Sequence, residues 1–237
     1  MNLVINSGYN SISDWIKKIP VSFSTQGNSI YKARNEIKIF DTDSGKIVVK
    51  SFKIPHFINR FAYSFIRFSK AKRSYIYSLE IIRRGFKAPQ PVAYIEIFKS
   101  GLLSESYYFS TYSDYLVMKN FSFMKKLTEE DVEILKAFAR FTAQLHDKDI
   151  YHKDYSNGNI LYKKEGEDIL FELVDLNRIQ FRKITEKLAY KSFHRLDFSI
   201  EMLEIVAREY ALQRNMDVEK SIAEIKRLNL KTMRKYR

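Results

Sequence analysis

The sequence predicts an α+β protein with two lobes, in which a strand-rich N-terminal lobe precedes a helical C-terminal lobe. Short strand-forming runs separated by turn residues dominate the first half, as is typical of an antiparallel sheet. Apolar residues recur at helical spacing through much of the second half. The chain has 237 residues, of which 45% are hydrophobic, so each lobe can bury a core. We place the lobes at residues 1–111 and 112–237.

The N-terminal lobe is expected to contain a hairpin followed by helices. Ser29–Phe40 and Lys46–Phe52 flank the turn-rich segment Asp41–Gly45 and are predicted to pair. Ile54–Phe68 has apolar side chains at helical spacing, and a second helix is predicted over Ala71–Arg84. Further strands are predicted at Val92–Phe98, Ser106–Thr111 and Tyr115–Met118.

The C-terminal lobe is expected to begin with a long helix. Thr128 is the predicted N-cap, because three acidic residues follow it in the first turn, where they favour the helix dipole. One apolar face then continues to His146. The remaining predicted elements are strands at Asn159–Tyr162 and Ile169–Val174 and helices at about Leu196–Arg214 and Val218–Leu228.

Composition excludes some chemistry and suggests a class of partner. There is no cysteine, which rules out disulfides, thiolate zinc sites and cysteine nucleophiles. Neither a secretory signal at Met1–Asn10 nor a long apolar run is visible, so we expect a cytoplasmic protein. The 41 basic and 28 acidic residues give a net charge of +13. That excess favours anionic partners, either a nucleotide, a nucleic acid or an anionic membrane surface.

The segment His152–Asn159 carries the strongest chemical pattern. It contains His-x-Asp and, five residues after the aspartate, an asparagine, and it resembles the catalytic loop of protein-kinase-like enzymes. Phosphoryl transfer needs a carboxylate at the attacking hydroxyl and an oxygen ligand for magnesium nearby. We therefore predict that Asp154 orients the hydroxyl and accepts its proton, and that Asn159 binds the metal. The alternative is a polar loop with one helix-capping aspartate.

Two further residues fit the same chemistry. Asp175 ends an apolar run, where a carboxylate is costly unless it is paired or bound to metal. It resembles the magnesium-binding aspartate of kinases, although its Asp-Leu-Asn triplet has no glycine. Lys50 ends the run Ile47–Val49 and resembles the strand lysine that contacts the nucleotide phosphates. The alternatives are a strand-ending turn for Asp175 and an exposed edge-strand lysine for Lys50.

The remaining parts of a nucleotide site are incomplete. Glu80 is the only acidic residue of its predicted helix, and we predict that it pairs with Lys50. The pairing position of the family pattern could instead fall at Ile76, one turn earlier, in which case the pair is replaced or missing. Gly27 is expected between two strands, in a loop whose backbone N–H groups cover the phosphates, although protein kinases have more glycines there.

From about Gly27 to Arg214 the chain resembles the lipopolysaccharide core kinase family. Members of this family phosphorylate Kdo (3-deoxy-D-manno-octulosonic acid) or heptose in the inner core. The resemblance is carried by Ile30–Asn35, Val49-Lys50, Ala71–Tyr75, Ala88–Pro91, Asp154–Asn159 and Asp175–Asn177. It implies a two-lobed protein-kinase-like fold, ATP and Mg²⁺ as cofactors and a lipid-linked core sugar as acceptor.

Three alternatives to a lipopolysaccharide core kinase are a protein kinase, a pseudokinase and a kinase of another small molecule. A protein kinase is disfavoured because no Ala-Pro-Glu follows Asp175 and little room remains for a peptide-docking segment. A pseudokinase, which binds nucleotide without turnover, is suggested by the poor glycine loop and the uncertain glutamate. A kinase of another small molecule, such as an aminoglycoside, is disfavoured by charge. Such acceptors are often cationic and favour an acidic pocket, whereas this chain has a net charge of +13.

Basic segments predict peripheral contact with the anionic inner membrane. Residues 50–87 contain ten basic residues and one acidic residue, Glu80, and Lys226–Arg237 adds six basic residues. Aromatic and aliphatic residues are interleaved in Ile54–Phe68. The alternative for this segment is a core-facing helix with a solvated basic side. No nucleic-acid motif is present, so a nucleic acid is not an expected partner.

Overall fold

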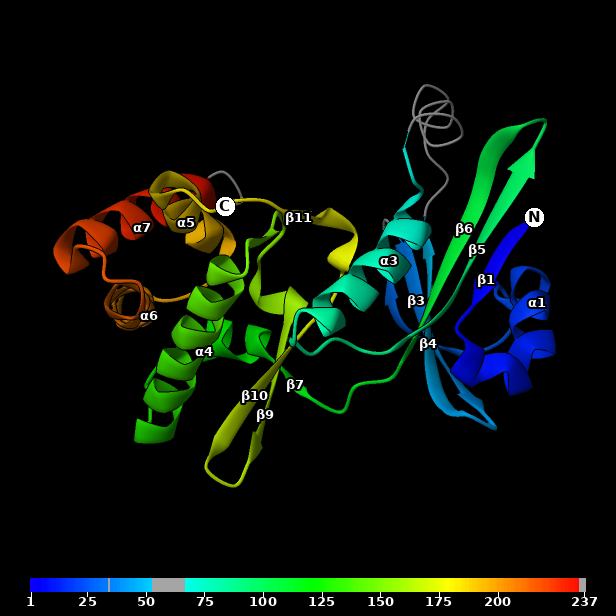
Figure 1. The fold of residues 1–237 in the computed structure, drawn as a ribbon. Helices are drawn as coiled ribbons and strands as arrows, with labels where there is room; N and C mark the ends of the chain where they lie inside the picture. Colours follow the sequence, from blue (N-terminus) through cyan, green and yellow to red (C-terminus); the bar gives the residue numbers. More distant parts are fainter. Residues whose placement is uncertain (34, 53–66, 235–237) are drawn as a thin grey trace. The chain divides into compact units, whose positions relative to one another are not determined.

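The computed structural model describes residues 1–33, 35–52 and 67–234, and it contains both strands and helices (Figure 1). The chain divides into two compact units, unit 1 at Met1–Asp114 and unit 2 at Tyr115–Arg237. The predicted α+β class is confirmed. Within the described ranges, every helix is too short or too polar to cross a lipid bilayer.

Unit 1 is built on an antiparallel sheet. Its described strands are β1 (Asn2–Ile5), β2 (Asn28–Lys32), β3 (Asn35–Thr42), β4 (Gly45–Phe52), β5 (Pro91–Lys99) and β6 (Leu102–Thr111), in the order β1-β5-β6-β4-β3-β2. The helices are η1 (Ser7–Ile12), α1 (Ser13–Ser22) and α3 (Lys70–Arg83). α1 and α3 cover opposite faces of this sheet, because their side chains enter two separate core clusters.

The alternation of side chains along β4 determines where Lys50 points. Val49 belongs to the core cluster that contains Ile16 of α1. Phe52 belongs to the other cluster, with Tyr75 of α3. Successive side chains of a strand point to opposite faces. Lys50 therefore points to the face that α3 covers.

The predicted hairpin at Asp41–Gly45 is confirmed, because β3 and β4 pair with Thr42 opposite Gly45. The single strand predicted over Ser29–Phe40 is wrong. β2 pairs antiparallel with β3, and Lys32 lies opposite Glu36, so the chain reverses after β2. No glycine or proline marks that reversal in the sequence, and strand-forming residues on both sides looked continuous.

Other predictions for unit 1 had mixed outcomes. The helix predicted at Ala71–Arg84 is confirmed as α3, and Gly85 follows it with a φ of 88°. β1 and α1 were missed, since the mixed start of the chain shows no clear period. Most of the helix predicted at Ile54–Phe68 lies outside the described residues.

Gly27 occupies the turn between α1 and β2, which corrects its predicted position between two strands. Its φ is 80°, a backbone conformation that favours glycine. A Cβ atom added there would lie 2.5 Å from the Phe40 ring, a residue of the core cluster beneath α1. Glycine is therefore required here for two reasons: the turn needs its positive φ, and the Phe40 ring occupies the space that a side chain would fill.

Gly27→Ala is expected to lower the free energy of unfolding by about 3 kcal/mol, since it combines a strained φ with an overlap against a core ring. Gly45→Ala is the matched control. Gly45 has a φ of 90° but no atom within 4 Å of an added Cβ, so about 1 kcal/mol is expected. Urea unfolding followed by circular dichroism measures both. Equal losses in the two variants would show that Phe40 moves aside at little cost.

Unit 2 is mainly helical. Its described elements are β7 (Leu116–Val117), η2 (Met118–Phe123), α4 (Glu129–Asp147), β8 (Ile150–His152), η3 (Asn157–Asn159), β9 (Ile160–Glu165), β10 (Asp168–Leu173), η4 (Leu176–Arg178), β11 (Ile179–Phe181), α5 (Glu186–Ser192), η5 (Phe193–Arg195), α6 (Ile200–Gln213) and α7 (Val218–Met233). β9 and β10 form a hairpin to which β7 adds, and β8 pairs with β11.

The long helix of unit 2 begins where the sequence predicts. The Thr128 hydroxyl accepts a hydrogen bond from the Asp131 N–H, and the Asp131 carboxylate accepts one from the Thr128 N–H. The helices predicted near residues 196–214 and 218–228 are confirmed as α6 and α7, with α7 continuing to Met233. The short strands β8 and β11 and helix α5 were missed, because elements this short show little periodicity.

His146 lies in the core of unit 2, on α4. Its Nδ1 is 2.6 Å from the Tyr210 hydroxyl of α6, and its Nε2 is 3.0 Å from the Ser192 hydroxyl of α5. Burial, aided by the positive charge of Arg214, lowers the pKa of His146 to about 3. The imidazole is therefore neutral in the folded protein and links three helices.

Acid is expected to weaken unit 2 through this histidine. The unfolded chain, with an ordinary histidine pKa of about 6.5, binds a proton that the folded state binds only near pH 3. Stability from this group is therefore complete above pH 6.5 and falls as the pH drops towards 3, by about 2 kcal/mol at pH 5. Urea unfolding at pH 7 and pH 5 measures this loss. His146→Gln should show a smaller difference between the two pH values, and an unchanged difference would contradict the assignment.

Candidate active site

His152, at the end of β8, connects two segments that carry the predicted site. Its Nδ1 accepts a hydrogen bond from the Asp154 N–H at 3.1 Å, so the proton of the neutral ring is on Nε2, 3.2 Å from the Val174 carbonyl oxygen. Burial lowers the pKa of His152 and keeps the ring neutral. One buried side chain therefore fixes the backbone beside Asp154 to the strand end that precedes Asp175.

Asn159 closes the loop that begins at Asp154. Its side-chain nitrogen donates to the Asp154 carbonyl oxygen at 2.8 Å, and its own carbonyl accepts from the Val174 N–H at 3.1 Å. Asn159 and Asp175 are therefore neighbours, although they are far apart in the sequence. Because the loop uses the amide nitrogen, the amide oxygen is the atom that can bind a cation.

Asn157 anchors the same loop, a role that was missed from the sequence. Its side-chain nitrogen donates to the Ser122 hydroxyl and to the Asp197 carbonyl, and its oxygen accepts from the Asp197 N–H at 2.9 Å. The side chain is buried. In the sequence, only the position of Asn157 inside the catalytic-loop pattern indicated a role. Its partners Ser122 and Asp197 lie in segments without a motif.

Asp175 adopts a left-handed backbone, with a φ of 55° and a ψ of 47°. Aspartate tolerates this conformation better than most residues do, and such strain is concentrated at functional sites. Its carboxylate accepts a hydrogen bond from the Asn177 side-chain amide. The turn without glycine is thus made by the predicted metal ligand itself and is supported by Asn177.

Two arginines that the sequence analysis did not select bind the Asp154 carboxylate. Arg178 Nη1 donates to one carboxylate oxygen at 3.2 Å, and Arg195 Nη1 donates to the other. Arg178 follows the Asp-Leu-Asn triplet directly, which could have drawn attention to it. Arg195 lies in η5, outside every motif.

The residues proposed to bind Mg²⁺ offer two oxygen ligands. In the part of the chain that the structure describes, no three His, Asp or Glu residues lie close enough together to hold a metal ion. Mg²⁺ at a phosphoryl-transfer site needs only one or two protein oxygen ligands, since phosphates and water complete its shell. The Asn159 amide oxygen and the Asp175 carboxylate, joined through Val174, fit that requirement.

Lys50 lies in unit 1, on the sheet face covered by α3. It is opposite Tyr108 in the β4–β6 register, and the Tyr108 hydroxyl is 2.8 Å from the Ser78 hydroxyl of α3. The Lys50 amine lies 5.3 Å from the centre of the Phe52 ring. Ile76 of α3 packs against the cluster that contains Phe52. The position weighed as an alternative to Glu80 is therefore apolar and packed close to the strand that carries Lys50.

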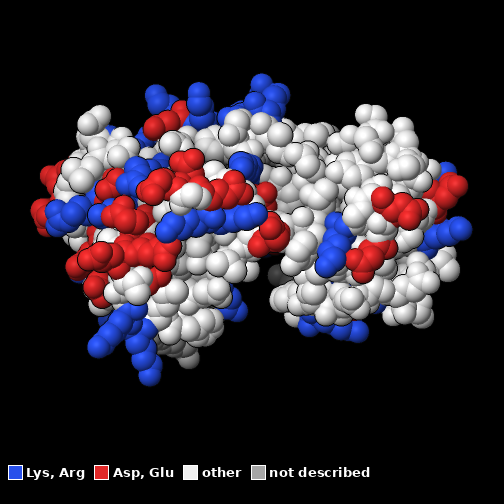
Figure 2. Space-filling model, turned by 90° about the horizontal axis from the view of Figure 1, so that it is seen from below, with Lys and Arg blue, Asp and Glu red and all other residues white. Residues whose placement is uncertain are grey.

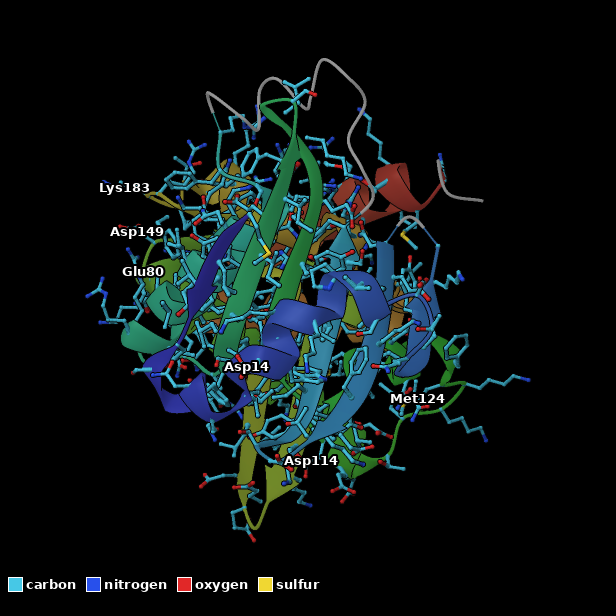
Figure 3. The ribbon with its side chains drawn as sticks, turned by 90° about the vertical axis from the view of Figure 1, so that its right-hand side faces the viewer. Asp14, Glu80, Asp114, Met124, Asp149 and Lys183 are labelled. Atoms are coloured by element: carbon cyan, nitrogen blue, oxygen red, sulfur yellow. The ribbon has the colours of Figure 1, made fainter. Side chains whose placement is uncertain are left out.

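Glu80 lies on α3 (Figure 3). Its carboxylate accepts hydrogen bonds at 2.7 Å from Arg83 and from Arg84. Hydrogen bonds from Arg83 and Arg84 lower the pKa of Glu80 to about 2. The pairing with Lys50 is not among these contacts and stays a prediction.

If Glu80 keeps Arg83 and Arg84 as its partners during turnover, Glu80→Gln will leave the KM for ATP within about twofold of wild type. Exposed ion pairs within one helix contribute little, so stability should also change only slightly. Steady-state kinetics with ATP as the varied substrate measures the effect. A rise in the KM for ATP of about tenfold, absent from the control Glu133→Gln on α4, would instead show that Glu80 pairs with Lys50 during turnover.

Comparison with known proteins decides the family. The profile described as the Lipopolysaccharide kinase (Kdo/WaaP) family matches residues 80–218, more than half of the chain. This chain belongs to that family. No curated protein sequence matches it.

Solved structures show that this family member shares a known fold. The structure described as WaaP in complex with acyl carrier protein covers 99% of this chain and 98% of its own, with a TM-score of 0.66 and 15% identity. The kinase domain of Mycobacterium tuberculosis PknI, as a double mutant, covers 85% of this chain and 94% of its own, with a TM-score of 0.47 and 11% identity. The match to WaaP, together with the family, confirms the predicted fold of the lipopolysaccharide core kinases.

Family membership also establishes the class of activity. The lipopolysaccharide kinase is an ATP-dependent phosphotransferase that acts on a sugar hydroxyl. This agrees with Asp154, Asn159 and Asp175 being held in one hydrogen-bonded arrangement in unit 2. The pseudokinase alternative is not favoured by the family match.

Proposed function

We propose that this lipopolysaccharide kinase phosphorylates a hydroxyl group of Kdo or heptose in the inner core, with ATP as donor and Mg²⁺ as metal. The observation that carries the proposal is the loop around Asp154. His152 and Asn159 fix that loop to the strand end before Asp175. The proposed base and the two proposed metal ligands are thereby preorganised, which is what phosphoryl transfer requires.

Asp154 orients the acceptor hydroxyl and takes its proton. The hydroxyl oxygen forms a bond to the γ-phosphorus, the bond from that phosphorus to the β,γ-bridging oxygen breaks, and ADP leaves. Asp154 is partly exposed, so an acceptor can reach it. The Asp154 N–H to His152 hydrogen bond holds the backbone of the base in place while the proton moves.

The nucleotide contacts are divided among three residues. Asn159 and Asp175 would hold Mg²⁺, which neutralises phosphate charge when it is bound. Lys50 would contact the phosphates as a point charge. A nucleotide-binding role for Gly27 stays a prediction, because its position is explained by the turn and by the packing of Phe40.

We further propose a cytoplasmic protein that lies peripherally at the inner membrane. Support comes from the net charge of +13 and from a lipid-linked acceptor. The face in Figure 2 mixes both signs of charge over the helices of unit 2. On α7, Lys226 and Arg227 pair with Glu204 and Glu224, so among the described residues at the end of this helix a membrane contact would use Lys231 and the C-cap residue Arg234. Acyl carrier protein, found with WaaP, is a candidate partner.

Transfer of labelled phosphate from ATP tests the function. Purified protein with Mg²⁺ is offered a Kdo-bearing lipid A precursor, a heptose-bearing core lipid and a generic protein, and products are identified by mass spectrometry. We expect phosphate on a core sugar, formed about 10³-fold more slowly with Asp154→Asn. Phosphate on the generic protein alone would contradict the proposal.

A further inference from the structure

The contacts of Asp154 contain more positive charge than a catalytic base needs. One carboxylate receives two guanidinium groups, Arg178 on one oxygen and Arg195 on the other. This group of three carries a net charge of +1, and the neighbouring Lys153 is exposed. Such an excess beside the reacting hydroxyl favours an acceptor that is itself an anion.

Both arginines are held in place by contacts of the surrounding backbone. The Arg178 carbonyl accepts from the Lys153 N–H at 3.4 Å. The segment that carries Arg195 is fixed by Asn229 of α7, whose side chain donates to the carbonyls of Phe193 and Leu196. The side chains nevertheless remain 46% exposed for Arg178 and 30% exposed for Arg195. They can therefore contact a ligand without any rearrangement of the backbone.

The arginines also occupy the oxygens that the reaction needs. To orient a hydroxyl, Asp154 must turn one oxygen from a guanidinium towards the acceptor. A carboxylate on the acceptor can take over that guanidinium, because arginine binds carboxylates in a matching planar geometry. A neutral sugar has no carboxylate to offer for such an exchange. Acceptor recognition and release of the base are thus coupled.

We infer that Arg178 and Arg195 recognise a carboxylate on the acceptor sugar, so that the acceptor is a sugar acid of the Kdo type and not a neutral heptose. This inference rests on the proposed function and names the substrate class of the same site. It makes the two arginines specificity-determining residues, whereas Asp154 remains the base.

The kinetic test compares two acceptors that differ at the Kdo carboxylate alone. They are a Kdo-bearing lipid A precursor and the same lipid with the Kdo carboxylate converted to its methyl ester. We expect wild type to show a KM at least about tenfold lower for the acid, the size of one charge-assisted hydrogen bond. Arg178→Gln and Arg195→Gln should raise the KM for the acid about tenfold more than the KM for the ester, so that the preference for the acid is lost.

Arg208→Gln is the matched control, because Arg208 pairs with Glu219 on the surface of unit 2, and it should leave all these constants unchanged. Arg195→Lys should recover part of the preference for the acid, since it restores the charge without the planar fork. Equal losses of kcat for acid and ester, with unchanged KM values, would overturn the inference by showing that the arginines only position Asp154.

A binding experiment separates this inference from the proposed function. Calorimetric titration of free Kdo and of a neutral heptose into the protein without ATP should show tighter binding of Kdo, which Arg195→Gln abolishes. Equal binding of the two sugars by wild type would overturn the inference, whether or not the lipid is phosphorylated. Kdo binding through the arginines without any phosphate transfer would support the inference and contradict the proposed function.

Discussion

Asp154→Asn is expected to lower kcat by about 10³-fold while the KM for ATP stays within about twofold of wild type. The amide keeps the size of the side chain and can still accept a hydrogen bond from an arginine, but it cannot take the proton of the acceptor hydroxyl. Removing a general base typically costs between about 10² and 10⁴ in rate, and 10³ corresponds to about 4 kcal/mol of barrier. Single-turnover transfer of labelled phosphate measures the chemical step.

Asp168→Asn is the control for this experiment, because Asp168 is an exposed residue at the start of β10 and should behave as wild type. Circular dichroism should show the same unfolding midpoint for both variants within a few degrees. If Asp154→Asn transferred phosphate at the normal rate, Asp154 would not be the base, and another group would have to accept the proton.

Asp175→Asn should reduce kcat by at least about 10²-fold and raise the Mg²⁺ concentration needed for half-maximal rate about tenfold or more. A carboxylate is the charged ligand of the proposed metal pair, and an amide binds Mg²⁺ far more weakly. Folding should be little affected, because asparagine also tolerates the left-handed backbone of this position, where φ is 55°. Rates measured across a Mg²⁺ titration provide the test.

Asn177→Ala separates metal binding from support of the turn. Asn177 donates to the Asp175 carboxylate but is not a proposed metal ligand. Asn177→Ala should therefore raise the Mg²⁺ concentration needed for half-maximal rate less than Asp175→Asn does. A normal Mg²⁺ dependence in Asp175→Asn would show that Asp175 is not a metal ligand. The left-handed turn would then be a structural feature of the strand end alone.

Some features of unit 1 could not be predicted from local pattern. Glu80 and Ile76 are one turn apart on the same helix, so periodicity does not distinguish them. The packed structure shows Ile76 against the cluster of Phe52 and Glu80 held by Arg83 and Arg84. Likewise, the reversal after β2 has no turn signature, and only the pairing of β2 with β3 reveals it.

By itself, the sequence determined the α+β class, most long elements and the residues proposed for the chemistry. The reason is that these signals are local: Asp154 and Asn159 share one loop, and Thr128 caps its helix with a residue three positions away. Only the tertiary structure brought Arg178 and Arg195 to Asp154, across 24 and 41 residues of sequence. A charged side chain has no period or motif that names a distant partner, so contacts of this kind are decided by folding.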